Sequence, residues 1–291
     1  VYSATAEELR LQMEYVQRHC SVVSLQEVLG WIGGTARPDE NTCSVLVTFD
    51  DAYIDNYEIA FPILKDVGIP AVFFVPTAFT GTNRLTWWDE IAWMLKQARR
   101  RKFTLHYPEA LAVDLERRPL LRELGAVLDL HKRPGMGESE RFLSDLAEAC
   151  GSPRPGPAAE RCFCDWDELR AMLGAGMAVE AHTHTHPVLS QIPAEKQAEE
   201  LATNRGLLAA KLGVAPKALA YPVGMRNSFS RETEDAVRGA GLEAAFSFYG
   251  GMNPLPLQNP MDIQRESVGY QSMDRFCAQV AAGRVWGRIW P

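Results

Sequence analysis

Short apolar runs alternate with longer amphipathic stretches along most of this 291-residue chain. The runs at 44–49, 71–76 and 218–221 are apolar at nearly every position, which is typical of strands buried on both faces of a sheet. Helical periodicity is expected at 5–19, 52–67, 193–212, 230–240 and 273–282, and shorter strands at 22–23, 177–179, 244–248 and 266–270. This alternation, with short connections, predicts a parallel α/β sheet or barrel.

Local signals mark several helix ends. Thr5 and Ser24 precede helical patterns and are suited to cap them, and Gly68 follows the helix predicted to end near Val67. The segment from about 82 to 165 reads as a mostly helical insertion, with the basic run 99–102 as a solvated helix end. Its tryptophans are either core anchors or a platform for sugar rings, and an apolar stripe favours the core, formed by Trp88, Ile91, Ala92 and Leu95.

Composition limits the classes of protein to which the chain can belong. With 46% hydrophobic residues, the chain can bury one large core, and we expect a single domain over residues 1–291. The net charge of −7 argues against nucleic-acid partners and anionic membranes. A bilayer-spanning run or signal peptide is not apparent, although numbering begins at Val1 and an upstream segment could have been removed. Six cysteines without a C-x-x-C pair favour buried thiols and a cytoplasmic location.

Three of the six histidines follow the apolar run at 177–179, at alternate positions: His182, His184 and His186. A spacing of four residues would place the rings of His182 and His186 on one side of a helical turn, where neutral imidazoles bind divalent metals. The alternative is a polar turn whose histidines are satisfied by ordinary hydrogen bonds. A metal site requires a third ligand from another segment.

Two adjacent carboxylates, Asp50 and Asp51, end the apolar run at 44–49. Neighbouring side chains at a strand end point in different directions, so one carboxylate can bind a metal while the other acts on a water. In parallel α/β folds, active sites lie at the C-terminal ends of strands. The aspartates, the histidines and Tyr221 all follow predicted strands directly, which agrees with one shared site.

Taken together, these segments resemble the polysaccharide deacetylase family, also called carbohydrate esterase family four or the NodB homology domain. The resemblance rests on three motifs, at 48–53 (TFDDAY), 182–187 (HTHTHP) and 219–224 (LAYPVG). It extends to the segments at 56–64 and 68–76, which follow the first motif. It implies a distorted TIM-like barrel of about seven strand–helix units and removal of N-acetyl groups from carbohydrate substrates. The strand that precedes the first helix in that family is missing here, which means either a trimmed start or a barrel open at that side.

The resemblance also implies roles for single residues. Asp51, His182 and His186 would bind Zn²⁺ or another divalent ion such as Co²⁺ or Fe²⁺, and Asp50 would be the general base. Tyr221, Pro222 and Val223 belong to the third motif and would contact substrate. The backbone N–H near Val223 would help to hold the tetrahedral oxyanion.

Two departures from the family pattern affect the catalytic roles. Ala220 stands where the best-known members have an arginine that positions the base, so Arg226 or Arg265 would have to reach in instead. Those members also use a C-terminal histidine as general acid, but no histidine follows His186. The acid would therefore be His184, a residue outside the usual scheme, or absent.

Three functions follow from this pattern. The first is a metal-dependent hydrolase that removes N-acetyl groups from amino sugars of a polysaccharide or its lipid-linked precursor. The second is a related amidohydrolase acting on N-formyl sugars or cyclic amides. The third is a carbohydrate-binding relative with weak or no catalysis. Metal content and the choice between N-acetyl and N-formyl sugars would separate the three.

Overall fold

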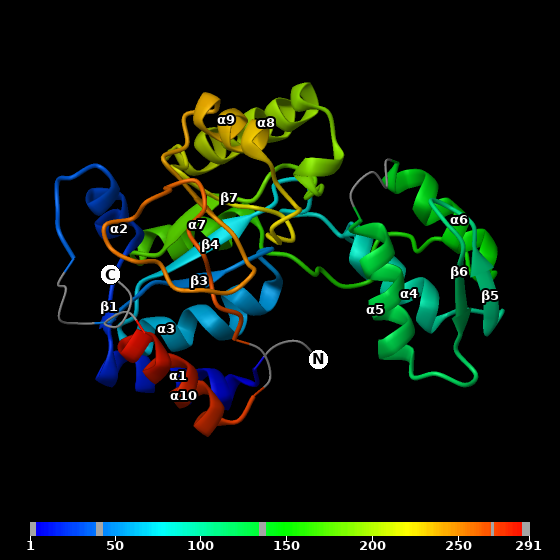
Figure 1. Cartoon of the computed structure of the whole chain (residues 1–291), viewed down its shortest axis with the longest axis horizontal. Coiled ribbons are helices and arrows are strands. Elements are labelled where there is room, and N and C mark those ends of the chain that lie inside the picture. Colours follow the sequence, from blue (N-terminus) through cyan, green and yellow to red (C-terminus); the bar gives the residue numbers. More distant parts are fainter. Residues whose placement is uncertain (1–3, 39–42, 134–137, 269–270, 287–291) are drawn as a thin grey trace.

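The computed structural model describes residues 4–38, 43–133, 138–268 and 271–286, which form a barrel-like part and a lobe beside it (Figure 1). A five-stranded parallel sheet curls into a half-barrel, and this confirms the predicted barrel-type α/β fold. Its strands, in spatial order, are β3 (Val47–Phe49), β4 (Ala71–Val75), β7 (Ala178–Ala181), β8 (Ala218–Ala220) and β9 (Ala244–Phe246). A second parallel pair consists of β1 (Ser21–Val22) and β2 (Ser44–Val45).

The helices of the barrel begin and end where local chemistry predicts. Thr5 caps α1 (Ala6–His19) and Ser24 caps α2 (Leu25–Ile32), each in a capping box with the glutamate three residues later. Gly68, at a φ of 75°, ends α3 as predicted. The other barrel helices are α3 (Phe61–Val67), α7 (Trp166–Gly174), α8 (Ala194–Leu212), α9 (Arg231–Gly239) and α10 (Met273–Trp286). No helix in the described ranges is both long and apolar enough to cross a bilayer.

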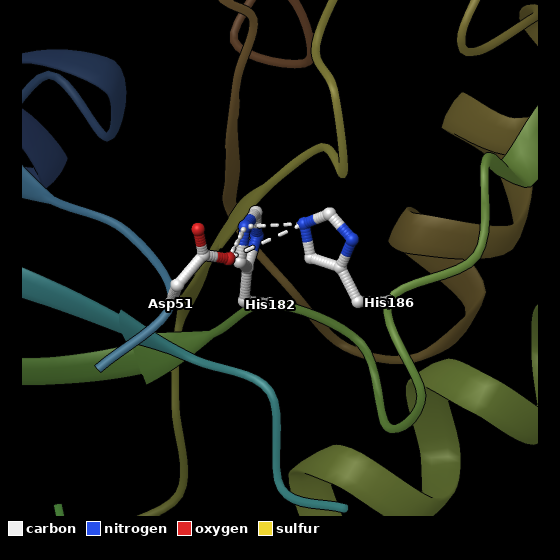
Figure 2. A group of neighbouring side chains, drawn as sticks. All are labelled: Asp51, His182 and His186. Carbon is white, nitrogen blue, oxygen red and sulfur yellow. Dashed lines mark hydrogen bonds and ion pairs between the residues drawn. The ribbon is translucent and has the colours of Figure 1, made fainter. Parts of the chain in front are cut away.

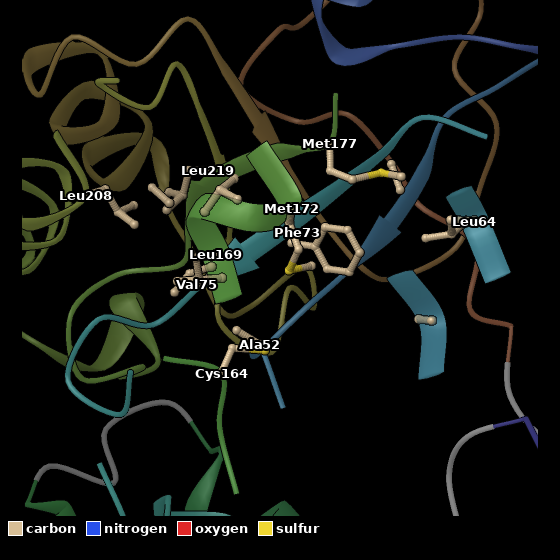
Figure 3. Close-up of a cluster of buried hydrophobic side chains, with 14 of the residues drawn as sticks. Ala52, Leu64, Phe73, Val75, Cys164, Leu169, Met172, Met177, Leu208 and Leu219 are labelled. Atoms are coloured by element: carbon tan, nitrogen blue, oxygen red, sulfur yellow. The ribbon is translucent and has the colours of Figure 1, made fainter. Parts of the chain in front are cut away.

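Both faces of the central sheet are buried, as the continuous apolar runs predict. Along β4, Phe73 and Val75 point into the larger core cluster, while Val72 and Phe74 point to the opposite face. The larger cluster packs the sheet against α1, α3, α7, α8 and α9, and part of it is drawn in Figure 3. The other face packs against α2 and the segment around Ile263. The strand ends are therefore held rigidly from both sides.

Two predicted elements of the barrel differ from the structure. The stretch expected to be one helix after Asp51 contains a π-helix, Asn56–Ala60, which precedes α3. The last strand, expected at 266–270, does not form at Glu266–Val268, and residues 269–270 lie outside the described part. The chain instead pairs earlier, through an isolated parallel bridge between Ile263 and Phe246.

The insertion forms the lobe seen to one side of the half-barrel in Figure 1. It contains α4 (Trp87–Lys96), β5 (Lys102–Leu105), β6 (Leu111–Asp114), α5 (Leu120–His131) and α6 (Ser139–Cys150). The antiparallel β5–β6 pair was not predicted, and the basic run 99–102 follows α4 and leads into β5, which begins at Lys102, rather than forming a helix end. The lobe packs around its own cluster of buried apolar side chains, drawn from all five elements.

Candidate active site

Asp51, His182 and His186 converge at the C-terminal edge of the sheet (Figure 2). Asp51 follows β3, and the two histidines follow β7. The Nε2 atoms of both histidines lie 3.4 Å from Asp51 Oδ1 and 3.1 Å from each other. Two segments about 130 residues apart therefore supply one compact set of donor atoms.

The histidine segment is a loop and not the helical turn considered from the sequence. Thr183 and His186 adopt left-handed φ values of 62° and 59°, and Asp51 has a φ of 71°. Side chains other than glycine avoid this region, so the surrounding contacts must hold these residues in place. The backbone turns bring His186 back to His182, although their spacing is not helical here.

The hydrogen bonds of His182 define which ring nitrogen faces the cluster. Its Nδ1 lies 2.7 Å from the Ala220 carbonyl oxygen and must donate to it, because a carbonyl only accepts. The lone pair of Nε2 therefore points toward Asp51 and His186. Such an outer hydrogen bond is the usual way in which a protein fixes a metal-binding imidazole.

The charges around the donor atoms favour a cation between them. Burial lowers the pKa of a histidine, but at His182 the adjacent Asp51 carboxylate and the charge of Asp50 raise the pKa overall. Burial and the neighbouring His182 lower the pKa of His186 to about 4, which keeps that ring neutral. Asp51 Oδ1 is buried without a hydrogen-bond partner. This acceptor-only oxygen and two imidazole nitrogens fit a divalent ion of the zinc, cobalt or iron type.

Arg265 reaches Asp50, the neighbour of Asp51. Its Nη1 and Nη2 donate to the two carboxylate oxygens of Asp50 at 2.7 and 2.8 Å, and its Nε donates to the Ser247 carbonyl oxygen. Burial by itself raises the pKa of the Asp50 carboxyl, but the Arg265 and His182 charges hold the pKa below its ordinary value. Arg226, the other arginine considered from the sequence, lies over the Tyr249 ring at 4.2 Å.

His184 is oriented away from Asp51, His182 and His186. Its Nδ1 lies 2.9 Å from Thr77 Oγ1, and the residue lines a small pocket against α8 together with Lys196 and Glu200. In an extended segment the side chains of His182, His184 and His186 would share one side, so their divergence reflects the left-handed turn at Thr183. The structure does not bring His184 to the site, so the acid role expected for it is not carried further.

Two polar residues of α8 that sequence reasoning missed brace the histidine loop. Glu200 accepts hydrogen bonds from the backbone N–H groups of His184 and Thr185 at 2.8 and 2.7 Å. Buried Asn204 donates to the carbonyl oxygens of Val75 and Thr183, and so joins the ends of β4 and β7. The one signal in the sequence is a polar residue at a core position of the helix, in the series Gln197, Leu201, Asn204 and Leu208.

The third motif forms a tight turn after β8. The Tyr221 side chain is buried in the core, where it stacks on Phe229 and its hydroxyl donates to the Met261 carbonyl oxygen at 2.9 Å. The Tyr221 side chain is therefore not available for the expected contact with substrate. Pro222 is also buried, and half-buried Val223 has a φ of 64°.

The first turn of α4 also touches the site. Trp87 Nε1 donates to the His186 carbonyl oxygen at 3.2 Å, and the Trp88 ring lies 4.4 Å from the His186 ring. The stripe predicted for this helix therefore needs correction, because Trp88 turns to the His186 ring while Ile91, Met94 and Leu95 enter the core of the lobe.

The arrangement of strand-end acids and histidines agrees with the result of a family comparison. A profile described as "Polysaccharide deacetylase" matches residues 37–110 and 131–245, about two thirds of the chain. The chain belongs to the polysaccharide deacetylase family. It is accordingly a hydrolase that acts on carbon–nitrogen bonds, and its family implies a carbohydrate substrate. Comparison with curated protein sequences gives no match.

Solved structures of polysaccharide deacetylases share the fold at low sequence identity. The Streptococcus pyogenes deacetylase PplD in complex with acetate matches with a TM-score of 0.60 and 16% identity, over 94% of this chain and 86% of that one. IcaB from Ammonifex degensii matches with a TM-score of 0.58 and 20% identity, over 96% and 89% of the two chains. The BpsB deacetylase domain from Bordetella bronchiseptica matches with a TM-score of 0.52 and 18% identity, over 87% of this chain and 81% of that one.

Proposed function

We propose that this chain is a metal-dependent deacetylase that removes N-acetyl groups from amino sugars of a polysaccharide or of its lipid-linked precursor. The observation that carries the proposal is the meeting of Asp51, His182 and His186 beside an aspartate held by Arg265. Three protein ligands at a strand edge leave room for water or substrate, as in catalytic rather than structural metal sites. Two of the similar structures, PplD and the BpsB domain, are deacetylases, which supports the same reaction.

Asp51, His182 and His186 would hold the ion, with Zn²⁺ as the first choice and Co²⁺ or Fe²⁺ as alternatives. A bound divalent ion would polarise the amide carbonyl and make water a better nucleophile at neutral pH. The Ala220 carbonyl oxygen keeps the His182 ring in the orientation that this requires.

Asp50 is the general base in this proposal. It accepts a proton from the attacking water, and Arg265 keeps the carboxylate ionised and correctly oriented. The Val223 backbone N–H stabilises the charge that develops on the acyl oxygen. The C–N bond then breaks, and the leaving nitrogen takes up the proton that Asp50 accepted from the water, which gives the free amine and acetate and restores the Asp50 carboxylate.

The test is acetate release from a panel of N-acetylated glycans, measured after metal removal and after addition of Zn²⁺, Co²⁺ or Fe²⁺. Release that requires the metal supports the proposal. Release of formate from N-formyl sugars, without acetate release, would assign the chain to the related amidohydrolases instead. Stoichiometric metal together with glycan binding and no cleavage would point to a carbohydrate-binding relative.

A further inference from the structure

We propose that Trp88 and Asp89, at the start of α4, form with Tyr53 a sugar-binding subsite beside the metal centre. The helical lobe would thus take part in substrate selection. This inference rests on the proposed function, because it names the part of the same site that binds the sugar ring.

The three side chains form one hydrogen-bonded chain next to a metal ligand. Trp88 Nε1 donates to the Tyr53 hydroxyl oxygen at 2.7 Å, and that hydroxyl donates to Asp89 Oδ2 at 2.8 Å. The Trp88 ring lies 4.4 Å from the His186 ring at an angle of 59°. Tyr53 is two residues from Asp51 in the sequence, so this hydrogen-bonded group connects to the segments of both Asp51 and His186.

The two adjacent tryptophans have different tasks. Trp87 packs on the core of the lobe, stacks on His131 at 4.1 Å and donates to the His186 carbonyl oxygen, so it joins the lobe to the histidine loop. Trp88 is half-buried and contacts Tyr53 and His186. An indole ring that is held in place and only partly covered is suited to stacking on the apolar face of a sugar.

Asp89 provides the polar half of the subsite. Its Oδ2 accepts from Tyr53 and from Thr86 Oγ1, whereas no described residue donates to Oδ1. Burial and the charge of Asp51 raise the pKa of Asp89, although the bonds from Thr86 and Tyr53 lower it in part. Oδ1 is not among the buried unpaired atoms, so water can reach it in the free protein, and a sugar that displaces this water would have to donate a hydroxyl in its place.

This chemistry gives selectivity as well as affinity. A substrate without the matching hydroxyl would leave Asp89 Oδ1 desolvated and unpaired, and sites of this kind reject such analogues strongly. An aromatic face beside a carboxylate acceptor is a surface suited to a neutral sugar ring.

The test compares metal-loaded wild type, Asp89→Asn and Trp88→Leu on the N-acetylglucosamine tetramer. We expect KM to rise roughly 10-fold or more in both variants while kcat changes less than about 3-fold, because ground-state contacts to the sugar are lost. Metal content should stay at the wild-type value. Asp145→Asn is the matched control, since Asp145 accepts backbone bonds elsewhere in the same lobe and should leave KM unchanged.

A fall in kcat at unchanged KM, or a loss of metal, would show that Asp89 acts through the metal centre and would overturn the subsite. Unchanged kinetics in both variants would overturn it too. If wild type does not cleave the tetramer, the proposed function fails for this substrate, and calorimetric binding of the tetramer decides the subsite separately. Binding by wild type that weakens roughly 10-fold in Asp89→Asn supports it, and equal or absent binding rejects it.

Discussion

Arg265 holds both carboxylate oxygens of Asp50 at 2.7 and 2.8 Å, from a position 215 residues further along the chain. The guanidinium is itself buried and fixed by the Ser247 carbonyl oxygen and by the Thr48 hydroxyl. A planar fork of this kind sets the direction of a carboxylate as well as its charge. Asp50 therefore has little freedom to rotate.

Arg265→Lys should reduce turnover more than it reduces metal binding. Lysine keeps the charge but offers a single point of contact, so Asp50 loses its fixed orientation, and we expect kcat/KM to fall roughly 10- to 100-fold. Arg226→Lys, at an exposed arginine that stacks on Tyr249, is the control and should change kcat/KM little. Deacetylation kinetics and elemental analysis measure the two effects, and equal losses in both variants would contradict the positioning role.

The two neighbouring aspartates should have separable effects. Asp50→Asn keeps the size of the side chain but removes the proton acceptor, so metal should bind while hydrolysis falls roughly 100-fold or more. Asp51→Asn removes a charged ligand and should weaken metal binding itself. Near-normal turnover of metal-loaded Asp50→Asn would exclude Asp50 as the base.

His182→Ala and His186→Ala should each abolish stoichiometric metal uptake, measured by elemental analysis.

Glu200→Ala should weaken metal binding without touching a ligand. The carboxylate holds the loop between His182 and His186, and its removal should let left-handed residues relax, with a loss in metal affinity of about 10-fold. Glu199→Ala is a matched control, because Glu199 is exposed and pairs with Lys196. Competition with a metallochromic indicator gives the dissociation constants. Equal affinity in the two variants would show that the brace is dispensable.

The helical lobe should lose stability as the pH falls from about 6.5 toward 4. Burial lowers the pKa of His131 from 6.5 to about 4, so in this pH range the unfolded chain takes up the proton first. The full shift corresponds to about 3 kcal/mol. Thermal unfolding at pH 7.5 and 4.5 tests this. His131→Gln should show a smaller pH dependence than wild type, whereas His106→Gln, at an exposed position of the lobe, should behave as wild type.

The elements that the sequence predicted well are those with local signals. Thr5 and Ser24 begin helices through contacts within four residues, and the apolar run at β4 identifies a strand buried on both faces. The pair β5–β6 lacked such a signal, because strands of four residues expose half of their positions and lie among strong helix formers. The fold class could therefore be predicted from the pattern of apolar runs, whereas the β5–β6 pair could not.

The site was predictable only as far as residue types allow. Asp51, His182 and His186 could be grouped because strand ends meet at one edge of a sheet. The choice between Arg226 and Arg265 depends on how the last loops pack, which the sequence does not specify. His184 was one of three alternatives for the general acid because no histidine follows His186, and the loop turns its ring toward α8.

The indole of Trp87 joins the lobe to the carbonyl of a histidine that would bind the metal. The lobe therefore cannot be replaced without affecting the position of this histidine. A chimera that receives a different lobe would change the position of His186 together with the wall of the site, and it would keep its metal geometry only if the graft carried an equivalent donor to that carbonyl. Redesign of substrate range in this scaffold should start within the first turn of α4 and leave Trp87 in place.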